Sequence, residues 1–149
     1  MSSLKVGLLG LGSTGLRALE EMVQEKEHIE LLNDRTISIL GIIIKNDRHI
    51  LSVQKGVIVS RDFEELINKK PEVMIEAIGE IELARTYIEY SLKKGCNVVS
   101  SNQECMAKYG EQLQVTAEKN KVQVIFEENV AEGISVIMSP PALITISQK

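Results

Sequence analysis

One glycine-rich segment near the N-terminus constrains the fold of this chain more than any other. An apolar run at residues 6–9 leads into a G-x-G-x-x-G motif, and a stretch with helical spacing of apolar residues follows. This order is typical of a dinucleotide phosphate site, because Gly10 permits a tight turn, Gly12 admits the pyrophosphate and Gly15 lets helix and strand pack closely. The free N–H groups at the start of the helix would face the phosphates. The expected phosphate-binding residues are Gly10, Gly12, Ser13, Thr14 and Gly15; the alternative is an incidental tight turn.

The composition limits the classes of partner. The chain has 149 residues, of which 44% are hydrophobic and 26% charged, and this balance is typical of a water-soluble globular protein. Its net charge of −4 argues against a nucleic-acid surface, which needs basic residues against the phosphates. Three Tyr, two Phe and no Trp leave few rings for base stacking. No apolar run approaches the length of a membrane span, so we expect neither a nucleic-acid nor a membrane partner.

Short apolar runs alternate along the chain with longer segments in which apolar residues recur at helical spacing. The expected strands are 5–9, 37–44, 57–59, 73–78, 97–100 and 122–126. The expected helices are 14–26, 63–68, 82–94 and 104–119. Short connections and right-handed crossovers then predict an α/β fold, with a doubly wound, mostly parallel sheet of the Rossmann type and helices on both faces.

No internal repeat or linker divides the sequence into parts. We expect one dinucleotide-binding domain over residues 1–138. An apolar run at 134–138 is followed by Pro140 and Pro141, which prevent a helix from continuing. Residues 139–149 would therefore form a C-terminal tail or a short edge strand.

Cysteine and histidine are too few to suggest a disulfide framework or a transition-metal cluster. Cys96 and Cys105 are the only cysteines, and we expect them to be buried small hydrophobic residues rather than nucleophiles. The N-terminus enters the first expected strand without a secretory leader. These features favour a reducing, cytoplasmic setting.

Five blocks of sequence occur in a recognisable order along the chain. The blocks are residues 6–15, 40–46, 73–79, 95–102 and 126–134. No single block is specific, but together they resemble the nucleotide-binding domain of homoserine dehydrogenases. That family interconverts homoserine and aspartate semialdehyde by hydride transfer with a nicotinamide cofactor, a step of amino-acid biosynthesis.

The resemblance implies a cofactor that lies along the carboxyl ends of the strands. Ile78 and Gly79 would line its adenosine and ribose side. Ser100, Ser101 and Asn102 would face the nicotinamide ribose, since short polar side chains can hydrogen-bond ribose hydroxyls at close range. From the residues alone, these three equally fit a simple strand-to-helix turn with an N-cap.

The charges after the second expected strand bear on the choice between NAD and NADP. A basic residue there favours the 2′-phosphate of NADP, whereas an acidic residue favours the ribose hydroxyls of NAD. Lys45 and Arg48 are basic and Asp47 is acidic, so we favour NADP slightly; a solvated charged loop is the alternative.

The chain departs from the family pattern at several positions. Gln103 stands where the family has a lysine that handles a proton in catalysis, and glutamine neither carries a positive charge nor exchanges a proton near neutral pH. Glu80 and Glu132 stand where the family has glycines. The resemblance also ends before the family's substrate-binding part. We therefore assign no catalytic residue and expect the chain to be inactive by itself.

The family also binds a monovalent cation through a glutamate and nearby main-chain carbonyls. The resemblance places Glu127 at that glutamate and assigns the carbonyls to Val130, Glu132 and Ile134, a set of hard oxygen ligands that suits Na⁺. The alternative is that Glu127 is an ordinary exposed acid at the end of a strand.

Two functions follow from these observations. The first is a domain of the homoserine dehydrogenase type that binds a nicotinamide dinucleotide, alone or with a separate substrate-domain chain. The second is a non-catalytic regulatory or interaction module derived from the same family, which would form a homodimer or bind another protein. A complete small reductase ranks below both, because no other catalytic arrangement replaces the lost lysine.

Overall fold

A computed structural model describes residues 2–10, 17, 20, 24, 27, 30–31, 35–43, 58–60, 62–127 and 130–138. Its sheet has six strands in the order β3-β2-β1-β4-β5-β6, and every pair is parallel. The strands are β1 (Ser2–Leu9), β2 (Arg35–Ile43), β3 (Ile58–Ser60), β4 (Val73–Glu76), β5 (Asn97–Ser100) and β6 (Val124–Phe126). This order is that of a doubly wound Rossmann sheet, so the predicted fold class is confirmed.

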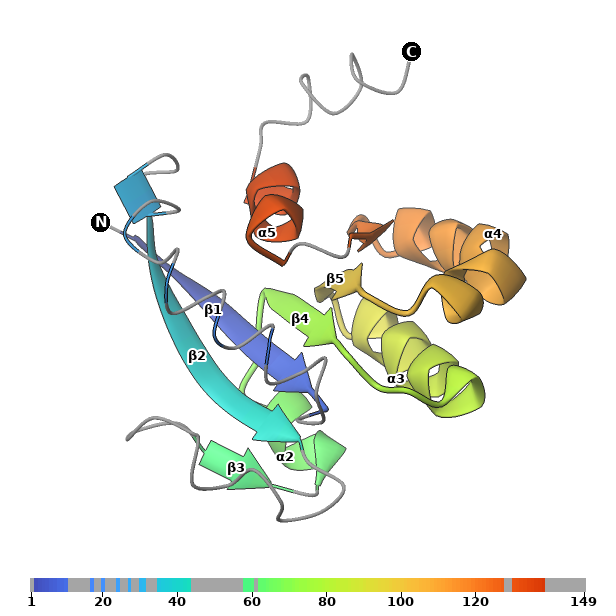
Figure 1. The fold of residues 1–149 in the computed structure, drawn as a ribbon, viewed down its shortest axis with the longest axis horizontal. Coiled ribbons are helices and arrows are strands. Elements are labelled where there is room, and N and C mark those ends of the chain that lie inside the picture. Colours follow the sequence, from blue (N-terminus) through green and yellow to red (C-terminus); the bar gives the residue numbers. More distant parts are fainter. Residues whose placement is uncertain are drawn as a thin grey trace.

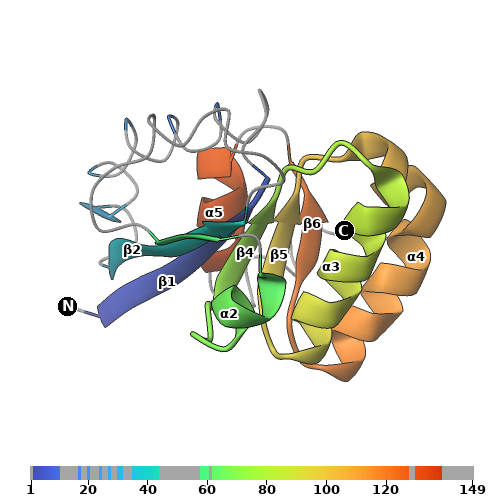
Figure 2. The same ribbon diagram turned by 90° about the horizontal axis from the view of Figure 1, so that it is seen from below.

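Four helices are bounded in the described part of the chain: α2 (Phe63–Ile67), α3 (Ile81–Lys93), α4 (Gln103–Lys119) and α5 (Val130–Met138). Between β1 and β2, helical positions with exposed side chains occur as late as Leu31, beyond the predicted end at residue 26. In Figures 1 and 2, α5 lies on one face of the sheet, and α2, α3 and α4 lie on the other.

Side chains of successive residues in each strand point to opposite faces of the sheet, because a strand is pleated. On β5, Val98 belongs to the apolar cluster under α3 and α4, while the neighbouring Val99 lies against α5 at Gly133. Both valines are fully buried. Burial on both faces explains why the strands read as nearly continuous apolar runs.

The structure corrects several predicted element boundaries, most of them by one to three residues, and adds one helix. β4 ends at Glu76 and not at Ile78, because the Ile78 N–H donates to the Glu76 side chain instead of to a neighbouring strand. β6 begins at Val124 and not at Val122, whose N–H donates to Ala117 at the end of α4. The run at 134–138 is part of the helix α5, which the strand and helix predictions did not include. The tail and edge strand predicted within 139–149 lie outside the described residues.

Candidate cofactor site

The sheet changes direction between β1 and β4. The chain passes from β1 outwards to β2 and β3, then returns to β4 on the other side of β1. In sheets of this kind, ligands bind beyond the carboxyl ends of the strands at such a switch point. Gly10 follows β1, Ile78 and Gly79 follow β4, and Ser101 follows β5, so the fold brings these predicted residues to one edge.

Gly10 makes the turn after β1 in a backbone conformation that favours glycine. Its φ is +96°, and a Cβ atom built there would lie 2.6 Å from the carbonyl oxygen of Ala77. The Gly10 N–H donates to Ile43 O at 2.8 Å, and the Ala77 N–H donates to Leu9 O at 2.8 Å. The turns after β1 and β4 therefore touch backbone to backbone, and only a residue without a side chain fits between them.

The turn after β4 leaves open space beside the glycine predicted to line the cofactor. Gly79 is exposed, and no heavy atom lies within 4 Å of the position its Cβ would take. Ile78 is half-buried, with its N–H held by the Glu76 carboxylate at 2.7 Å. Glu80, one of the departures from the family, is exposed and precedes the first residue of α3.

The polar residues after β5 form a network within the protein. Ser100 is fully buried, and its hydroxyl donates to Glu76 Oε1 at 2.6 Å. The Ser101 hydroxyl donates to Glu76 O at 3.0 Å. Asn102 is the N-cap of α4: its Oδ1 accepts from Cys105 N at 2.9 Å, and its Nδ2 donates to Ile78 O at 2.9 Å.

The N-cap interpretation of this segment is therefore confirmed, and contact with a ribose stays a prediction. Ser101 and Asn102 are half-buried, whereas Ser100 has no exposed surface. Of the three side chains, those of Ser101 and Asn102 are the better placed to reach a ligand, with Ser100 lying beneath them.

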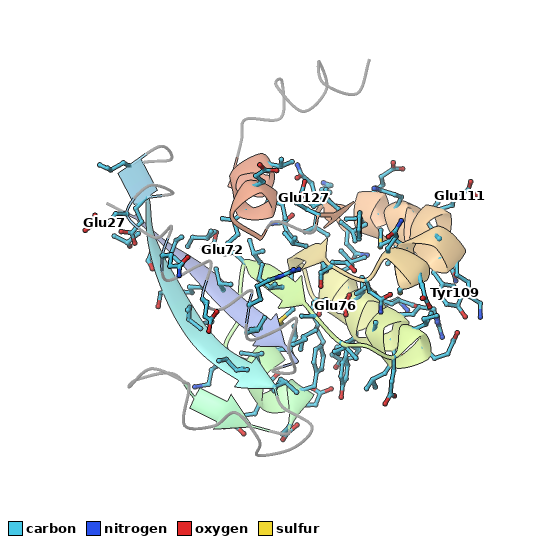
Figure 3. The ribbon with its side chains drawn as sticks, in the orientation of Figure 1. Glu27, Glu72, Glu76, Tyr109, Glu111 and Glu127 are labelled. Carbon is cyan, nitrogen blue, oxygen red and sulfur yellow. The ribbon has the colours of Figure 1, made fainter. Side chains whose placement is uncertain are left out.

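Glu76 is the functional candidate that sequence reasoning missed. It ends β4 in the middle of the molecule (Figure 3) and has no exposed surface. Burial raises the pKa of its carboxyl group above the ordinary value, and the hydrogen bonds from Ser100 and Ile78 oppose that rise. An acid inside the apolar run 73–78 was the available signal, because glutamate is almost never fully buried without a partner.

Gln103, which stands at the family's lysine position, is the first residue of α4 and is exposed. Its place beside Asn102 puts an uncharged amide at this edge of the sheet. The amide can donate and accept hydrogen bonds, but it adds no charge near the candidate site.

Both cysteines are buried, as predicted. Burial raises the pKa of the Cys96 thiol to about 11, and burial together with the nearby Glu76 charge raises the pKa of Cys105 to about 11. Thiols with such pKa values are poor nucleophiles at neutral pH.

The residues predicted to bind a monovalent cation lie around the start of α5. Glu127 is half-buried next to this helix (Figure 3), and its N–H donates to Ser100 O at 3.0 Å. Val130, Glu132 and Ile134 are on α5, where main-chain carbonyls face the next turn of the helix. This geometry adds no support for a cation site, which stays a prediction. The described residues contain no cluster of three or more His, Cys, Asp or Glu that would hold a metal ion.

Several predicted cofactor residues lie outside the described residues: Gly12, Ser13, Thr14, Gly15, Lys45 and Arg48. Their roles remain predictions from the sequence. None of the helices in the described part of the chain has both the length and the apolar character needed to cross a membrane.

The strand order and the glycine turn at the switch point define a dinucleotide-binding domain of the Rossmann class. The family model described as "Homoserine dehydrogenase, NAD binding domain" matches residues 9–127. The chain belongs to this family.

Similar proteins agree with that assignment. Homoserine dehydrogenase of Bacillus subtilis (strain 168) is 27% identical over 139 residues, which are 92% of this chain and 32% of the relative. The enzyme of Neisseria gonorrhoeae is 29% identical over 138 residues, 92% of this chain and 32% of the relative. The chain thus spans about a third of the length of the curated relatives it matches.

Solved structures show the same fold. Homoserine dehydrogenase from Thiobacillus denitrificans superposes with a TM-score of 0.79 at 27% identity, over 87% of this chain and 30% of that one. A biliverdin reductase from Synechocystis in complex with biliverdin and NADP⁺ has a TM-score of 0.66 at 20% identity, over 83% of this chain and 37% of that one. The second likeness concerns the fold alone.

Proposed function

We propose that this chain binds NADP, in preference to NAD, at the carboxyl ends of β1, β4 and β5. One observation carries the location: Gly10, with φ +96°, brings the turn after β1 against Ala77 at the point where the sheet changes direction. The open space beside Gly79 leaves room for a ligand on the same edge. Membership in the family supports a nicotinamide dinucleotide as that ligand.

Each group of residues has a distinct task in this proposal. Gly12, Ser13, Thr14 and Gly15 hold the pyrophosphate through backbone N–H groups. Gly10, whose own N–H donates to Ile43 O, belongs to the same phosphate site and makes the turn that admits the pyrophosphate. Ile78 and Gly79 line the adenosine and ribose side, and the turn of Ser101 and Asn102 faces the nicotinamide ribose. When bound, the cofactor supplies a hydride donor or acceptor. The protein's part is to bind and orient it.

The preference for NADP rests on Lys45 and Arg48, whose charges suit a 2′-phosphate. Calorimetric titration with NADPH and NADH tests it. We expect both to bind, NADPH more tightly, and a Lys45→Ala/Arg48→Ala variant to lose that preference while it still binds NADH. Equal affinity in the unsubstituted chain would refute the preference, and no binding of either at millimolar concentration would refute the cofactor site.

We propose further that the chain alone does not oxidise homoserine. Its span of about a third of the relatives and the uncharged Gln103 support this, because hydride transfer needs a substrate carbon held against the nicotinamide ring. An assay with homoserine and NADP⁺ should show no formation of NADPH above background, and clear turnover would overturn the statement.

The alternative function, a non-catalytic interaction module, is favoured by the exposed neutral Gln103 where the family has a lysine. It predicts a stable homodimer or a bound partner whatever the cofactor affinity. Light scattering of the purified chain measures the first outcome, and a monomer over a wide range of concentration would count against homodimer formation.

A further inference from the structure

Glu76 receives hydrogen bonds from both turns of the candidate site. Its carboxylate accepts from Ile78 N at 2.7 Å and from Ser100 Oγ at 2.6 Å. Its main-chain carbonyl accepts from Ser101 N and from Ser101 Oγ, both at 3.0 Å. Among the described residues, no Lys, Arg or His forms an ion pair with this carboxylate. The described partners of this carboxylate are all neutral donors, and a buried acid without a cationic partner lowers stability, so Glu76 is a candidate for a functional role.

Backbone N–H groups fix the direction of two hydrogen bonds in this network. The Asn102 N–H donates to Ser100 Oγ at 3.1 Å, and the Ser100 hydroxyl then has its own proton to donate to Glu76 Oε1. Ile78 N–H can only donate, so Glu76 Oε2 must act as an acceptor. The Ser100 hydroxyl can either donate or accept, so an ionised carboxylate receives a charge-assisted bond from it, whereas an amide of the same shape keeps at most a neutral bond.

The network is continuous with the glycine turn. Ala77, the next residue after Glu76, contacts Gly10 through its carbonyl and donates its N–H to Leu9 O. The network also reaches the start of α4, where Asn102 caps the helix and the charge of Glu76 acts on the Cys105 thiol. The position of one side chain thus bears on the turns after β1, β4 and β5.

We propose that Glu76 is a positioning residue for the dinucleotide site, whose carboxylate holds the turn after β4 and the turn after β5 in register with each other. This inference rests on the proposed function. Glu76 lies beneath the edge and acts through Ile78, Ser100 and Asn102. In particular, the bond to Ser100 orients the segment that faces the nicotinamide ribose.

Glu76→Gln and Ser100→Ala test the role, because Glu76→Gln removes the charge from the bond between Glu76 and Ser100, and Ser100→Ala removes the bond. Ser91→Ala is the matched control: Ser91 is also fully buried, and its hydroxyl donates to Tyr87 O at 2.7 Å within α3, away from the candidate site. Calorimetry would compare a whole reduced cofactor with its fragment that lacks the nicotinamide ribose. The pairs are NADPH with 2′-phospho-ADP-ribose and NADH with ADP-ribose, and the pair used is the one whose cofactor the unsubstituted chain binds more tightly.

We expect Glu76→Gln and Ser100→Ala to weaken the whole cofactor about tenfold more than the fragment, which corresponds to one lost charge-assisted hydrogen bond. The double variant should add little, since both changes break one network. Ser91→Ala should keep the unsubstituted ratio of the two affinities. A merely structural role for Glu76 would lower thermal stability but leave that ratio unchanged.

The outcomes separate this inference from the function on which it rests. If the unsubstituted chain binds and both Glu76→Gln and Ser100→Ala keep its affinity ratio, the positioning role is overturned and the cofactor site stands. If Glu76→Gln does not fold, Ser100→Ala against Ser91→Ala decides. If the unsubstituted chain binds neither cofactor, both the proposed function and the positioning role are overturned.

Discussion

Gly10 is a residue whose missing side chain matters more than any contact it makes. Its left-handed backbone conformation is cheap only for glycine, and the carbonyl of Ala77 occupies the place of a Cβ atom. The first constraint is local to the turn after β1, whereas the second arises from the close approach of two turns. A glycine-rich motif alone does not show the second, since the opposing backbone belongs to a segment almost seventy residues later.

Gly10→Ala should destabilise the chain by about 1–3 kcal/mol, through the strained φ and the contact with Ala77, and should weaken dinucleotide binding. Gly110→Ala is the control: a Cβ there meets only Met106 Cε at 3.9 Å within α4. The control should stabilise the chain by roughly 0.5–1 kcal/mol, because alanine is the better helix former. Urea denaturation measures both, and equal effects would contradict the strain argument.

Glu76 makes a prediction about pH. Burial raises its pKa in the folded chain above the ordinary value of 4.5, so the folded state binds more protons than the unfolded state between these two pKa values. Stability from this group is therefore greatest below pH 4.5 and is lost as pH rises through the folded pKa. Glu76→Gln does not titrate, so the unsubstituted chain should lose stability relative to it as pH rises above the ordinary pKa of the carboxyl group and through its folded pKa. Parallel stability curves in denaturant titrations would contradict the raised pKa.

At the scale of elements, close packing of α5 on β5 decides how the second face of the sheet is covered. A Cβ on Gly133 would lie 2.6 Å from Val99 Cγ1 and 3.4 Å from Glu127 Cβ. Helix and strand therefore approach more closely than a side chain would allow. Glu132 replaces the first glycine of the family's pair, and Gly133 keeps the second. The glycine that remains is the one at which α5 contacts β5 closely.

Gly133→Ala should cost about 1–3 kcal/mol, the usual range for overpacking a core. In a Val99→Ala background the same change should cost less, because the methyl groups that block the new Cβ are gone. Thermal or urea unfolding of the four chains in this cycle measures the coupling. Additive effects would show that Val99 is not the residue that requires glycine.

At the scale of the whole molecule, a ligand that binds the folded chain adds to the free energy of unfolding. A ligand that binds only the folded chain at one hundred times its Kd adds about 2.7 kcal/mol of stability. For a chain of this size, we expect NADPH at that concentration to raise Tm by roughly 5–10 °C. Melting curves with NADPH, with NADH and without ligand measure the shift. An unchanged Tm with both cofactors would argue that the edge of the sheet binds neither.

The sequence predicted the elements better than their ends. β5 matches its predicted bounds, and α4 begins one residue earlier than predicted, because apolar periodicity reports burial directly. The predicted end of β4 was wrong, since the apolar residues Ala77 and Ile78 continue the pattern after the hydrogen bonds of the sheet end. No local pattern shows that the Ile78 N–H turns to a side chain.

In the candidate site too, local features could be predicted from the sequence, whereas contacts between distant residues could not. The glycine turn after β1 and the polar run after β5 could be identified from residue type and position, because these reflect local backbone needs. The sequence could not assign a role to Glu76, because one of its two partners, Ser100, lies 24 residues later in the chain. Glutamate in a strand has many explanations until its neighbours are known.

The sequence by itself determined the α/β class, the parallel strands and the glycine at the first turn, because periodicity, short connections and backbone conformation are local properties. The tertiary structure decided which turns meet: Gly10 lies against Ala77, and Glu76 joins the ends of β4 and β5. Those contacts depend on strand order, and strand order is set by the packing of the whole sheet. The glycine motif is therefore readable from the sequence, while the buried carboxylate that we propose to position its ligand is visible only in the fold.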